Sequence, residues 1–387
     1  MKKICHISGT TIQGGGPEHI YQLIKRLNKN EWEVILCTSK DGSYWEKFNS
    51  IGIKSYNIVL RKISLNTAFQ LFSILRKEKP DLIHTHGKGP GLYGRFISIF
   101  FNIPTVHTFH GFHYEDLSTF IKWIHLTIET FLSIFTNHHI FVSAGEKNKA
   151  RILKFINEEN STVIHNGVDH EYLQNLPITR DIAFKLCGIE NWKPNKILGT
   201  ISRLSPEKGI LILLEAFSKA IKEIPDLRLI IIGGYPEEHK DYYLKLKKFL
   251  DEEKLTDYIC ILGYRLDAVK ILKCFDFYIS SSMSEGLPIG MLEALASGIP
   301  VVATDIAGNK DILRNSTYGV LTEPGSTESL YKGIVKIMQL TQMEQNILIK
   351  NASKRVKENF SIEGMAAKTA LLYKQILSEN TTQRLNH

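Results

Sequence analysis

Leu229-Ile230-Ile231-Ile232-Gly233-Gly234 is an apolar run that ends in two glycines. A strand that is apolar on both faces is typical of a parallel sheet covered by helices on each side. Short runs of this kind alternate with helical stretches along the whole chain. They predict strands at 3–8, 33–38, 55–59, 81–85, 104–108, 138–142 and 162–165, and again at 196–202, 227–233, 258–262, 275–280, 300–304 and 318–321. Because the pattern occurs twice, the sequence predicts two doubly wound α/β domains.

The length agrees with this division. A chain of 387 residues fits two domains of roughly 150 to 200 residues each. Proline, glycine and polar residues cluster around 170–195 and predict the break there, with one domain at 1–175 and the other at 190–360. Apolar residues at helical spacing predict a terminal helix at 361–379.

The composition is that of a soluble globular protein, with 43% apolar and 23% charged residues. The net charge is +8, and residues 1–180 hold most of the excess, with 21 Lys and Arg against 15 Asp and Glu. A basic first half suits a phosphorylated substrate, a phospholipid surface or a nucleic acid, and solvated lysine-rich faces are an equally good interpretation. No nucleic-acid-binding module is recognisable, so we expect no nucleic acid as partner.

The expected location is the cytoplasm. The five cysteines are odd in number and form no C-x-x-C pair, which favours buried thiols in a reducing compartment. The N-terminus reads as a first strand and not as a signal peptide. The most membrane-like stretch, 120–135, is interrupted by Lys122, His125 and Glu129 and is too short to span a bilayer. It predicts a partly buried helix.

A glycine loop follows the first strand. Gly14-Gly15-Gly16-Pro17 precedes a helical run at 19–27, and glycines between a strand and a helix let backbone N–H groups approach an anion. The spacing is neither that of a dinucleotide-binding loop nor that of a P-loop. A phosphate contact and a tight structural turn therefore stay equally open.

Two histidine clusters follow strands at 81–85 and 104–108. The carboxyl ends of parallel strands are where such sheets bind ligands. We expect His84 and His107 to be core residues, and His86, His110 and His113 to be placed for substrate. The carboxylates that usually complete a metal site are missing, so no metal is expected.

The second half carries a diphosphate site. Arg203 and Lys208 lie on the loop and opening turn after a strand, where a guanidinium and an ammonium form a plausible clamp. Ser284-Glu285-Gly286-Leu287-Pro288 then leads into a helix at 289–296 that holds Glu293. The apolar neighbours of Glu293 predict a largely buried helix, and a buried carboxylate needs partners. A carboxylate there can accept hydrogen bonds from sugar or ribose hydroxyls.

At these residues the chain resembles the retaining glycosyltransferases of family 4, which have the GT-B fold. Glu285 and Glu293 match the family's E-x7-E motif, and Ser202 to Gly209 match G-R-L-x-x-E-K-G with Ser202 in place of Gly. Asn166-Gly167-Val168-Asp169 matches the turn that closes the first domain, and the triple glycine matches the family's loop. At 307–311 Asp311 stands where the family has Glu, which puts contacts there in doubt.

The resemblance implies a fold and a set of roles. Two Rossmann-like domains would face each other across a cleft, the first binding the acceptor and the second the nucleotide sugar, and the helix at 361–379 would cross back onto the first. The implied donor site comprises Gly15, Gly16, Arg203, Lys208, Gly263, Tyr264, Arg265, Glu285, Gly286, Leu287 and Glu293. Among these, Arg203, Lys208 and Glu285 would act in catalysis together with His110. His86, Lys88 and His113 would contact the acceptor.

The resemblance also implies a reaction. Such enzymes retain the anomeric configuration without a metal cofactor. No carboxylate is clearly placed as a nucleophile, which favours attack on the same face, with the departing phosphate taking the acceptor's proton. The expected donor is a UDP-sugar.

The string from His107 to Tyr114 resembles that of bacterial enzymes that build surface polysaccharides (O-antigen, capsule, exopolysaccharide or lipopolysaccharide) on a polyprenyl diphosphate. Such an acceptor, and the apolar residues Phe120, Trp123 and Ile124, suit a peripheral contact with the anionic inner face of the plasma membrane. The alternatives are transfer to a small soluble acceptor and a GT-B-type nucleotide-sugar epimerase.

Overall fold

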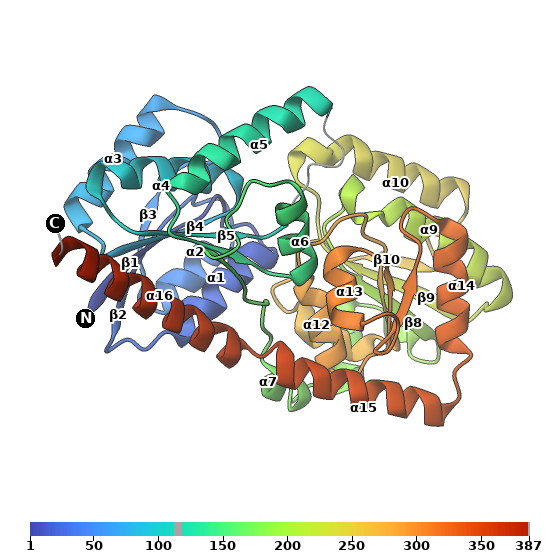
Figure 1. Ribbon diagram of the computed structural model, residues 1–387. Coiled ribbons are helices and arrows are strands. Elements are labelled where there is room, and N and C mark those ends of the chain that lie inside the picture. Colours follow the sequence, from blue (N-terminus) through green and yellow to red (C-terminus); the bar gives the residue numbers. More distant parts are fainter. Residues whose placement is uncertain (112–117, 386–387) are drawn as a thin grey trace. The chain divides into compact units, whose positions relative to one another are not determined.

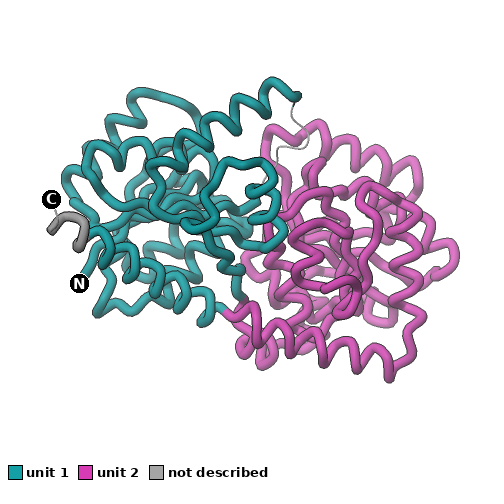
Figure 2. Tube along the Cα trace, in the orientation of Figure 1, with its two compact units in different colours: residues 1–167, 362–387 teal, residues 168–361 magenta. Residues whose placement is uncertain are grey.

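The computed structural model describes residues 1–111 and 118–385, with side chains to residue 380. The chain forms two compact units. Unit 1 comprises residues 1–167 and 362–387, and unit 2 comprises residues 168–361 (Figure 2).

Unit 1 is built on a parallel sheet of seven strands in the order β3-β2-β1-β4-β5-β6-β7. The strands are β1 Lys2–Ile7, β2 Trp32–Thr38, β3 Lys54–Asn57, β4 Leu82–His86, β5 Thr105–Phe109, β6 His138–Phe141 and β7 Ser161–Val163. The helices are α1 Gly15–Arg26, α2 Tyr44–Ser50, α3 Leu65–Glu78, α4 Lys88–Phe101, α5 Thr119–Ile134, α6 Ala144–Ile152 and α16 Ile362–Leu385 (Figure 1).

Helices cover both faces of this sheet. Leu23 of α1 and Tyr373 of α16 pack with Ile4 of β1 on one face. Leu75 of α3 and Ile97 of α4 pack on the other face. The double cover explains why the strands are apolar runs without alternation.

Unit 2 holds a parallel sheet of six strands in the order β10-β9-β8-β11-β12-β13. The strands are β8 Lys196–Ile201, β9 Leu227–Ile232, β10 Ile259–Ile261, β11 Phe277–Ser280, β12 Val301–Thr304 and β13 Val320–Thr322. The α-helices are α7 His170–Gln174, α8 Arg180–Cys187, α9 Ile210–Glu223, α10 Lys240–Glu252, α11 Ala268–Ile271, α12 Ile289–Ala296, α13 Ala307–Leu313, α14 Thr327–Met338 and α15 Gln342–Asn359. Short 3₁₀ turns lie at Glu190–Trp192, Pro206–Lys208, Glu237–His239 and Leu272–Cys274.

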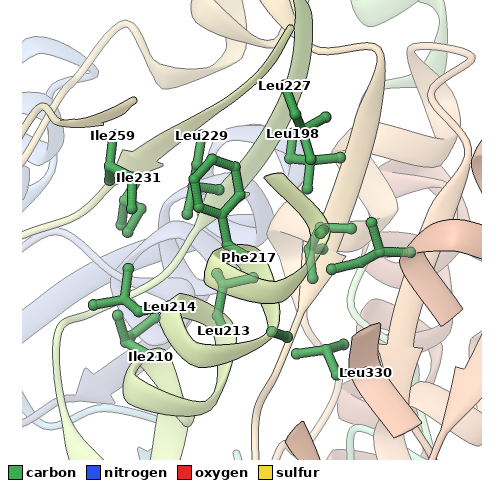
Figure 3. Close-up of a cluster of buried hydrophobic side chains, with 14 of the residues drawn as sticks. Leu198, Ile210, Leu213, Leu214, Phe217, Leu227, Leu229, Ile231, Ile259 and Leu330 are labelled. Carbon is green, nitrogen blue, oxygen red and sulfur yellow. The ribbon is translucent and has the colours of Figure 1, made fainter. Parts of the chain in front are cut away.

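The core of unit 2 lies between α9 and the middle of its sheet. Phe217 of α9 is fully buried and packs with Leu198 of β8 and Leu229 of β9 (Figure 3). The apolar run at 229–232 therefore belongs to a central strand, β9. All thirteen predicted strands are present, with ends that differ by a few residues, and the prediction of two doubly wound α/β sheets is confirmed.

The division between the units falls earlier than the break expected at 170–195. Val168 donates its backbone N–H to the carbonyl of Phe360 at 2.9 Å, and the side chain of His170 bonds to Ser353 at 2.8 Å. These contacts attach 168–175 to unit 2, so the first domain does not extend to residue 175. The terminal helix α16 starts one residue later than expected and runs on to Leu385.

In both sheets the strand order reverses direction at one place. It does so between β1 and β4 in unit 1, and between β8 and β11 in unit 2. Loops after such strand pairs diverge and leave room for a ligand at the carboxyl ends of the strands. These two places are therefore where the candidate residues must be sought.

Candidate functional site

In unit 2 the loops after β8 and β11 are held against each other. The backbone N–H of Met283 donates to the carbonyl of Glu207 at 2.8 Å, and the hydroxyl of Ser281 donates to the carbonyl of Lys208 at 2.9 Å. Gly209 completes the junction, because a Cβ there would lie 2.2 Å from the Ser281 carbonyl oxygen. The two loops thus form one structure at the point where the strand order reverses.

The basic side chains predicted to bind a diphosphate lie on this structure. Lys208 Nζ is 2.8 Å from Glu285 Oε1, and both side chains are largely shielded, with 12% and 16% of their surface exposed. The hydroxyl of Ser282 donates to the same Glu285 oxygen at 2.7 Å. Glu285 therefore fixes the position of the ammonium group.

Arg203 is the more exposed of the two cations, with 44% of its side chain accessible, and its Nη2 lies 3.2 Å from Glu207 Oε1. Burial alone would raise the pKa of Glu207. Hydrogen bonds from Ser205 and from its own backbone N–H, with the charges of Arg203 and Lys208, lower that pKa overall. Glu207 is thus held as an anion that orients the guanidinium of Arg203.

The start of α12 is supported from behind. Gly286 and Leu287 are buried at the end of the β11 loop, and Pro288 is the N-cap of α12. A Cβ on Gly308 of α13 would lie 2.5 Å from the carbonyl oxygen of Gly286, so the two elements meet closely. Sequence reasoning did not identify this support, because it is visible only once α13 is packed.

A buried amide holds the same loop. The Nδ2 of Asn309 donates to the carbonyl of Thr304 at 2.9 Å, and the hydroxyl of Thr304 donates to the carbonyl of Ser282. The segment 307–311, which departs from the family pattern at Asp311, thus contributes Gly308 and Asn309 as supports of the loop.

Glu293 lies on α12 among buried apolar residues and is itself half-buried. Burial raises the pKa of the nearby Tyr278 hydroxyl, and the negative charges of Glu285 and Glu293 raise it further. Both carboxylates of the E-x7-E motif therefore act on the same buried ring. The helix is largely buried, as its sequence predicts.

The segment after β10 is partly used within unit 2. Arg265 forms two 2.7 Å hydrogen bonds with the carboxylate of Asp267, and Gly263 accepts from the N–H of Gly233 at 2.8 Å. The ring of Tyr264 lies over Gly234, where a Cβ would come within 2.4 Å of it. Tyr264 keeps an exposed face, whereas the guanidinium of Arg265 is engaged by Asp267.

In unit 1 the triple glycine belongs to a helix and not to a loop. Gly14 is the N-cap of α1, and Gly15 and Gly16 form its first turn. The helix therefore starts before residue 19, where the sequence predicts it. A Cβ on Gly16 would meet nothing within 4 Å, so packing does not require glycine there. Free approach of a ligand to the helix N-terminus is a reason that fits.

The histidines of unit 1 fall into two groups. His84 and His107 are fully buried core residues, as predicted. The nitrogens of His84 bond to the hydroxyls of Tyr373 at 2.5 Å and Thr108 at 2.7 Å, and His107 bonds to Thr85 at 2.7 Å.

The residues expected at the substrate have different positions. His86 is buried and hydrogen-bonded at both ring nitrogens, to His6 and His110, which argues against a direct contact with the acceptor. His110 is half-buried. Lys88 lies at the start of α4, where desolvation of its ammonium group lowers its pKa. His113 lies outside the described residues.

Two further histidines complete the cluster and were missed by sequence reasoning. His6 lies on β1 and His19 on α1, and neither belongs to a motif. One nitrogen each of His6, His84 and His86 lie within 4.8 Å of one another, and so do those of His19, His86 and His110. Imidazoles in such sets could hold a metal ion, although His84 already uses both nitrogens.

Comparison with known families matches both halves of the chain. Residues 188–355 match the family described as Glycosyl transferases group 1, and residues 13–172 match the Glycosyltransferase Family 4. Together the two matches cover most of the sequence.

Relatives match over much or nearly all of the chain. The Escherichia coli UDP-Gal:alpha-D-GlcNAc-diphosphoundecaprenol alpha-1,3-galactosyltransferase is 26% identical over 382 residues, which cover 96% of each chain. The alpha-monoglucosyldiacylglycerol synthase of Streptococcus pneumoniae is also 26% identical, over 74% of this chain and 67% of its own. Among solved structures, Anabaena HepE in complex with UDP and glucose superposes with a TM-score of 0.85 at 21% identity, over 97% of this chain and 100% of its own.

Proposed function

Because this chain belongs to the family-4 glycosyltransferases and has the GT-B fold, we propose that it transfers a sugar from a UDP-sugar to a saccharide carried on a polyprenyl diphosphate. The observation that carries the proposal is the pair of cations, Arg203 and Lys208. Two carboxylates hold them at the place in unit 2 where the strand order reverses. The E. coli relative is named for UDP-Gal as donor and a diphosphoundecaprenol-linked acceptor, which supports both substrates. Surface polysaccharide synthesis in the cytoplasm is the role that suits such an acceptor.

In this proposal unit 2 binds the donor. Arg203 and Lys208 neutralise the diphosphate. The amides of Gly286 and Leu287, which precede α12, and the partial positive charge at the N-terminus of that helix add to this. Glu293 accepts hydrogen bonds from the ribose, and Glu285 from the donor sugar. Gly263, Tyr264 and Arg265 flank the base, with the exposed ring of Tyr264 as the stacking surface.

The proposed reaction retains the anomeric configuration and needs no metal. The bond from the anomeric carbon to the diphosphate oxygen breaks, and the acceptor oxygen attacks from the same face. Its proton passes to the departing phosphate oxygen, so the nucleoside diphosphate leaves without a protein base. Lys208 and Arg203 stabilise the charge that develops on the leaving group, which places most of the catalysis in electrostatics and positioning.

Unit 1 supplies the remaining contacts in this proposal. The N-terminus of α1, with Gly15 and Gly16, offers backbone N–H groups to phosphate oxygens. His110 meets the transferred sugar, and Lys88 contacts the acceptor.

A lipid-linked acceptor calls for a membrane surface, and we assign it to the helices α3, α4 and α5. The structure holds no helix, within residues 1–111 and 118–385, that is long and apolar enough to cross a bilayer. α5 buries Glu129 and Leu132 and exposes much of its remaining surface, so the expectation of a partly buried helix is confirmed. The three helices are packed side by side (Figure 1) and expose Leu65, Phe69, Phe96, Ile99, Phe100, Phe120, Ile121, Trp123, Ile128, Phe131 and Ile134.

The charges on this surface suit an anionic bilayer. Both carboxylates within the three helices, Glu78 and Glu129, are buried and paired with basic groups. Arg76 and Lys77 of α3 are exposed, as are Arg61 and Lys62 just before it. Basic residues beside exposed aromatic rings attract anionic headgroups while the rings enter the interface.

Flotation with vesicles tests this surface. The protein should float with vesicles that contain phosphatidylglycerol at low salt, and much less with pure phosphatidylcholine. The double variant Phe120→Ser, Trp123→Ser should lose this binding. Met343→Ser, Ile347→Ser, which removes exposed apolar residues from α15, should keep it. Equal flotation of both variants, or none by the wild type, would contradict the assignment.

The activity itself is tested by pairing donors with acceptors. UDP-, GDP- and ADP-sugars are each incubated with a synthetic lipid-diphosphate sugar and with the same sugar free in solution, and the product's anomeric configuration is read by NMR. We expect transfer from a UDP-sugar to the lipid-linked acceptor with retention. Inversion sinks the mechanism, transfer only to the free sugar points to a soluble acceptor, and epimerised donor without transfer points to the epimerase alternative.

A further inference from the structure

Three histidines of unit 1 form an unbroken chain of hydrogen bonds. His6 Nδ1 lies 3.0 Å from His86 Nε2, and His86 Nδ1 lies 3.2 Å from His110 Nε2. The rings of His6 and His86 are stacked with centroids 5.3 Å apart, and those of His86 and His110 are stacked at 5.4 Å. This hydrogen-bond chain starts at His6 in the core on β1, continues through His86 on β4, and ends at the half-buried His110 beyond β5.

All three rings are neutral in the folded protein. Burial lowers the pKa of His6 to about 3, and it lowers those of His86 and His110 well below their usual value. A neutral imidazole carries one N–H donor and one lone pair. Each hydrogen bond in the chain therefore needs one donor and one acceptor, and only two arrangements of the protons satisfy both bonds.

The inner end of the chain decides between the two arrangements. His6 Nε2 is buried and has no hydrogen-bond partner among the described residues. A proton on that atom would leave a buried N–H unsatisfied, which is rarer in proteins than an unsatisfied acceptor. His6 therefore carries its proton on Nδ1 and donates to His86, which must donate from its own Nδ1 to His110.

We propose that His6 and His86 are positioning residues that hold His110 in the tautomer with its proton on Nδ1. His110 then presents an N–H donor, and not a lone pair, at Nδ1, the ring nitrogen that does not bond to His86. The inference rests on the proposed role of His110 beside the transferred sugar, where such a donor would bind a sugar oxygen. His86, which the sequence placed at the acceptor, acts through His110 instead.

The surrounding groups hold the rings without joining the chain. Both nitrogens of His84 are engaged by Tyr373 and Thr108. His19 Nδ1 lies 2.9 Å from the side-chain oxygen of Asn166, so it donates there and keeps a lone pair on Nε2. The competing interpretation is a metal ion bound by His19, His86 and His110. Because both nitrogens of His86 are already in hydrogen bonds, such an ion would have to replace one of these bonds.

Nitrogen NMR of the full chain labelled with ¹⁵N-histidine reads the tautomers directly. The long-range couplings of each ring should show the proton on Nδ1 for His6, His86 and His110. A proton on Nε2 of His110 would overturn the proposal. Elemental analysis of the purified protein accompanies the spectra, and a stoichiometric metal that is lost in His19→Ala would overturn it as well.

Variants of His6 test whether the hydrogen-bond chain affects kcat. His6→Leu removes the donor and should lower kcat at least about tenfold with little change in the donor's KM, since the ring of His110 is then free to change tautomer. His6→Asn places an amide N–H near the position of Nδ1 and should recover most of kcat. His139→Leu, which removes a buried histidine of β6 outside the chain, is the control for a loss of core packing and should stay active.

Equal losses of kcat in His6→Leu and His6→Asn would contradict the proposal. Should His6→Leu fail to fold, the wild-type spectra and His6→Asn still decide. The failure of the proposed function has a different signature. If His110 is the Nδ1–H tautomer but His110→Ala is fully active, the hydrogen-bond chain is confirmed and the proposed role of His110 at the sugar is contradicted.

Discussion

Lys208 and Arg203 differ in how far water reaches them. Lys208 and its partner Glu285 are largely shielded, whereas Arg203 is 44% exposed. Charges interact more strongly where water is excluded, because less dielectric screening separates them. We therefore expect Lys208 to contribute more to stabilising the leaving diphosphate, and Arg203 more to capturing it from solution.

Lys208→Ala should lower kcat by about 10² to 10³, the usual cost of losing one charged group that stabilises a transition state. Initial-rate kinetics with the nucleotide sugar measure the loss, and calorimetry with the nucleoside diphosphate measures the weaker binding. Lys219→Ala is the matched control, because Lys219 forms a 2.8 Å pair with Glu328 at an exposed place in the same unit. Near-wild-type kcat in Lys208→Ala, or an equal loss in the control, would contradict the assignment.

At the scale of elements, Gly209 joins the start of α9 to the loop after β11. Its φ of 61° lies in the left-handed region, and a Cβ would lie 2.2 Å from the Ser281 carbonyl. Gly188, at the end of α8, has a similar φ of 68° but open space around it. Substituting Gly188 therefore tests backbone strain alone, whereas substituting Gly209 adds displacement of the loop that carries Glu285.

Gly209→Ala should lower activity at least about tenfold, because displacing a catalytic group by about 1 Å is already costly. Gly188→Ala should cost only the roughly 1–2 kcal/mol of left-handed strain and leave activity unchanged. Thermal melts and initial rates of the two variants measure both effects. Equal activity in both variants would show that the junction does not position the site.

The strands could be predicted because strands covered on both faces are continuous apolar runs, as in β9 and β11. The start of α1 could not, since Gly15 and Gly16 disfavour helix, whereas the helix includes both in its first turn. The unit boundary was placed too late, because the contact of His170 with Ser353 joins residues far apart in the chain.

The candidate site divides in the same way. Arg203, Lys208, Glu285 and Glu293 follow strands or sit in a motif, so their grouping was predictable from the sequence. His6, His19 and Asn166 join the histidine cluster only through the tertiary fold. The burial of His86 was missed for the same reason: a residue at a strand's carboxyl end is exposed only if no neighbouring ring covers it.

At the scale of the whole molecule, buried histidines are confined to one unit. Unit 1 buries His6, His19, His84, His86, His107 and His139, whereas the histidines of unit 2, His170 and His239, are not buried. Burial lowers the pKa of His19 to about 4 and that of His139 to about 3. In the unfolded chain these groups titrate near 6.5, so acid should act on the two units differently.

The direction in which pH changes the stability of unit 1 follows from proton binding. Between pH 6.5 and about 4.5 the unfolded state of unit 1 takes up protons that the folded state refuses, so the stability of unit 1 falls as the pH falls. Even one such histidine costs about 1.4 kcal/mol one pH unit below 6.5, or a few degrees in Tm. Unit 2 should change less in this range. Partial burial also lowers the pKa of its His170, but its carboxylates with lowered pKa values, such as Glu207 and Asp267, lose their contribution only at lower pH.

Thermal proteolysis at pH 7.5, 6.5 and 5.5, with the fragments mapped by mass spectrometry, follows each unit separately. We expect the cleavage temperature of unit 1 to drop with acidification while that of unit 2 drops much less. His139→Leu should flatten the pH dependence of unit 1, because it removes one proton acceptor from the unfolded state. A parallel drop of both units would mean that the buried histidines do not govern acid stability, and a rise in unit 1 would contradict the neutral state that the proposed hydrogen-bond chain requires.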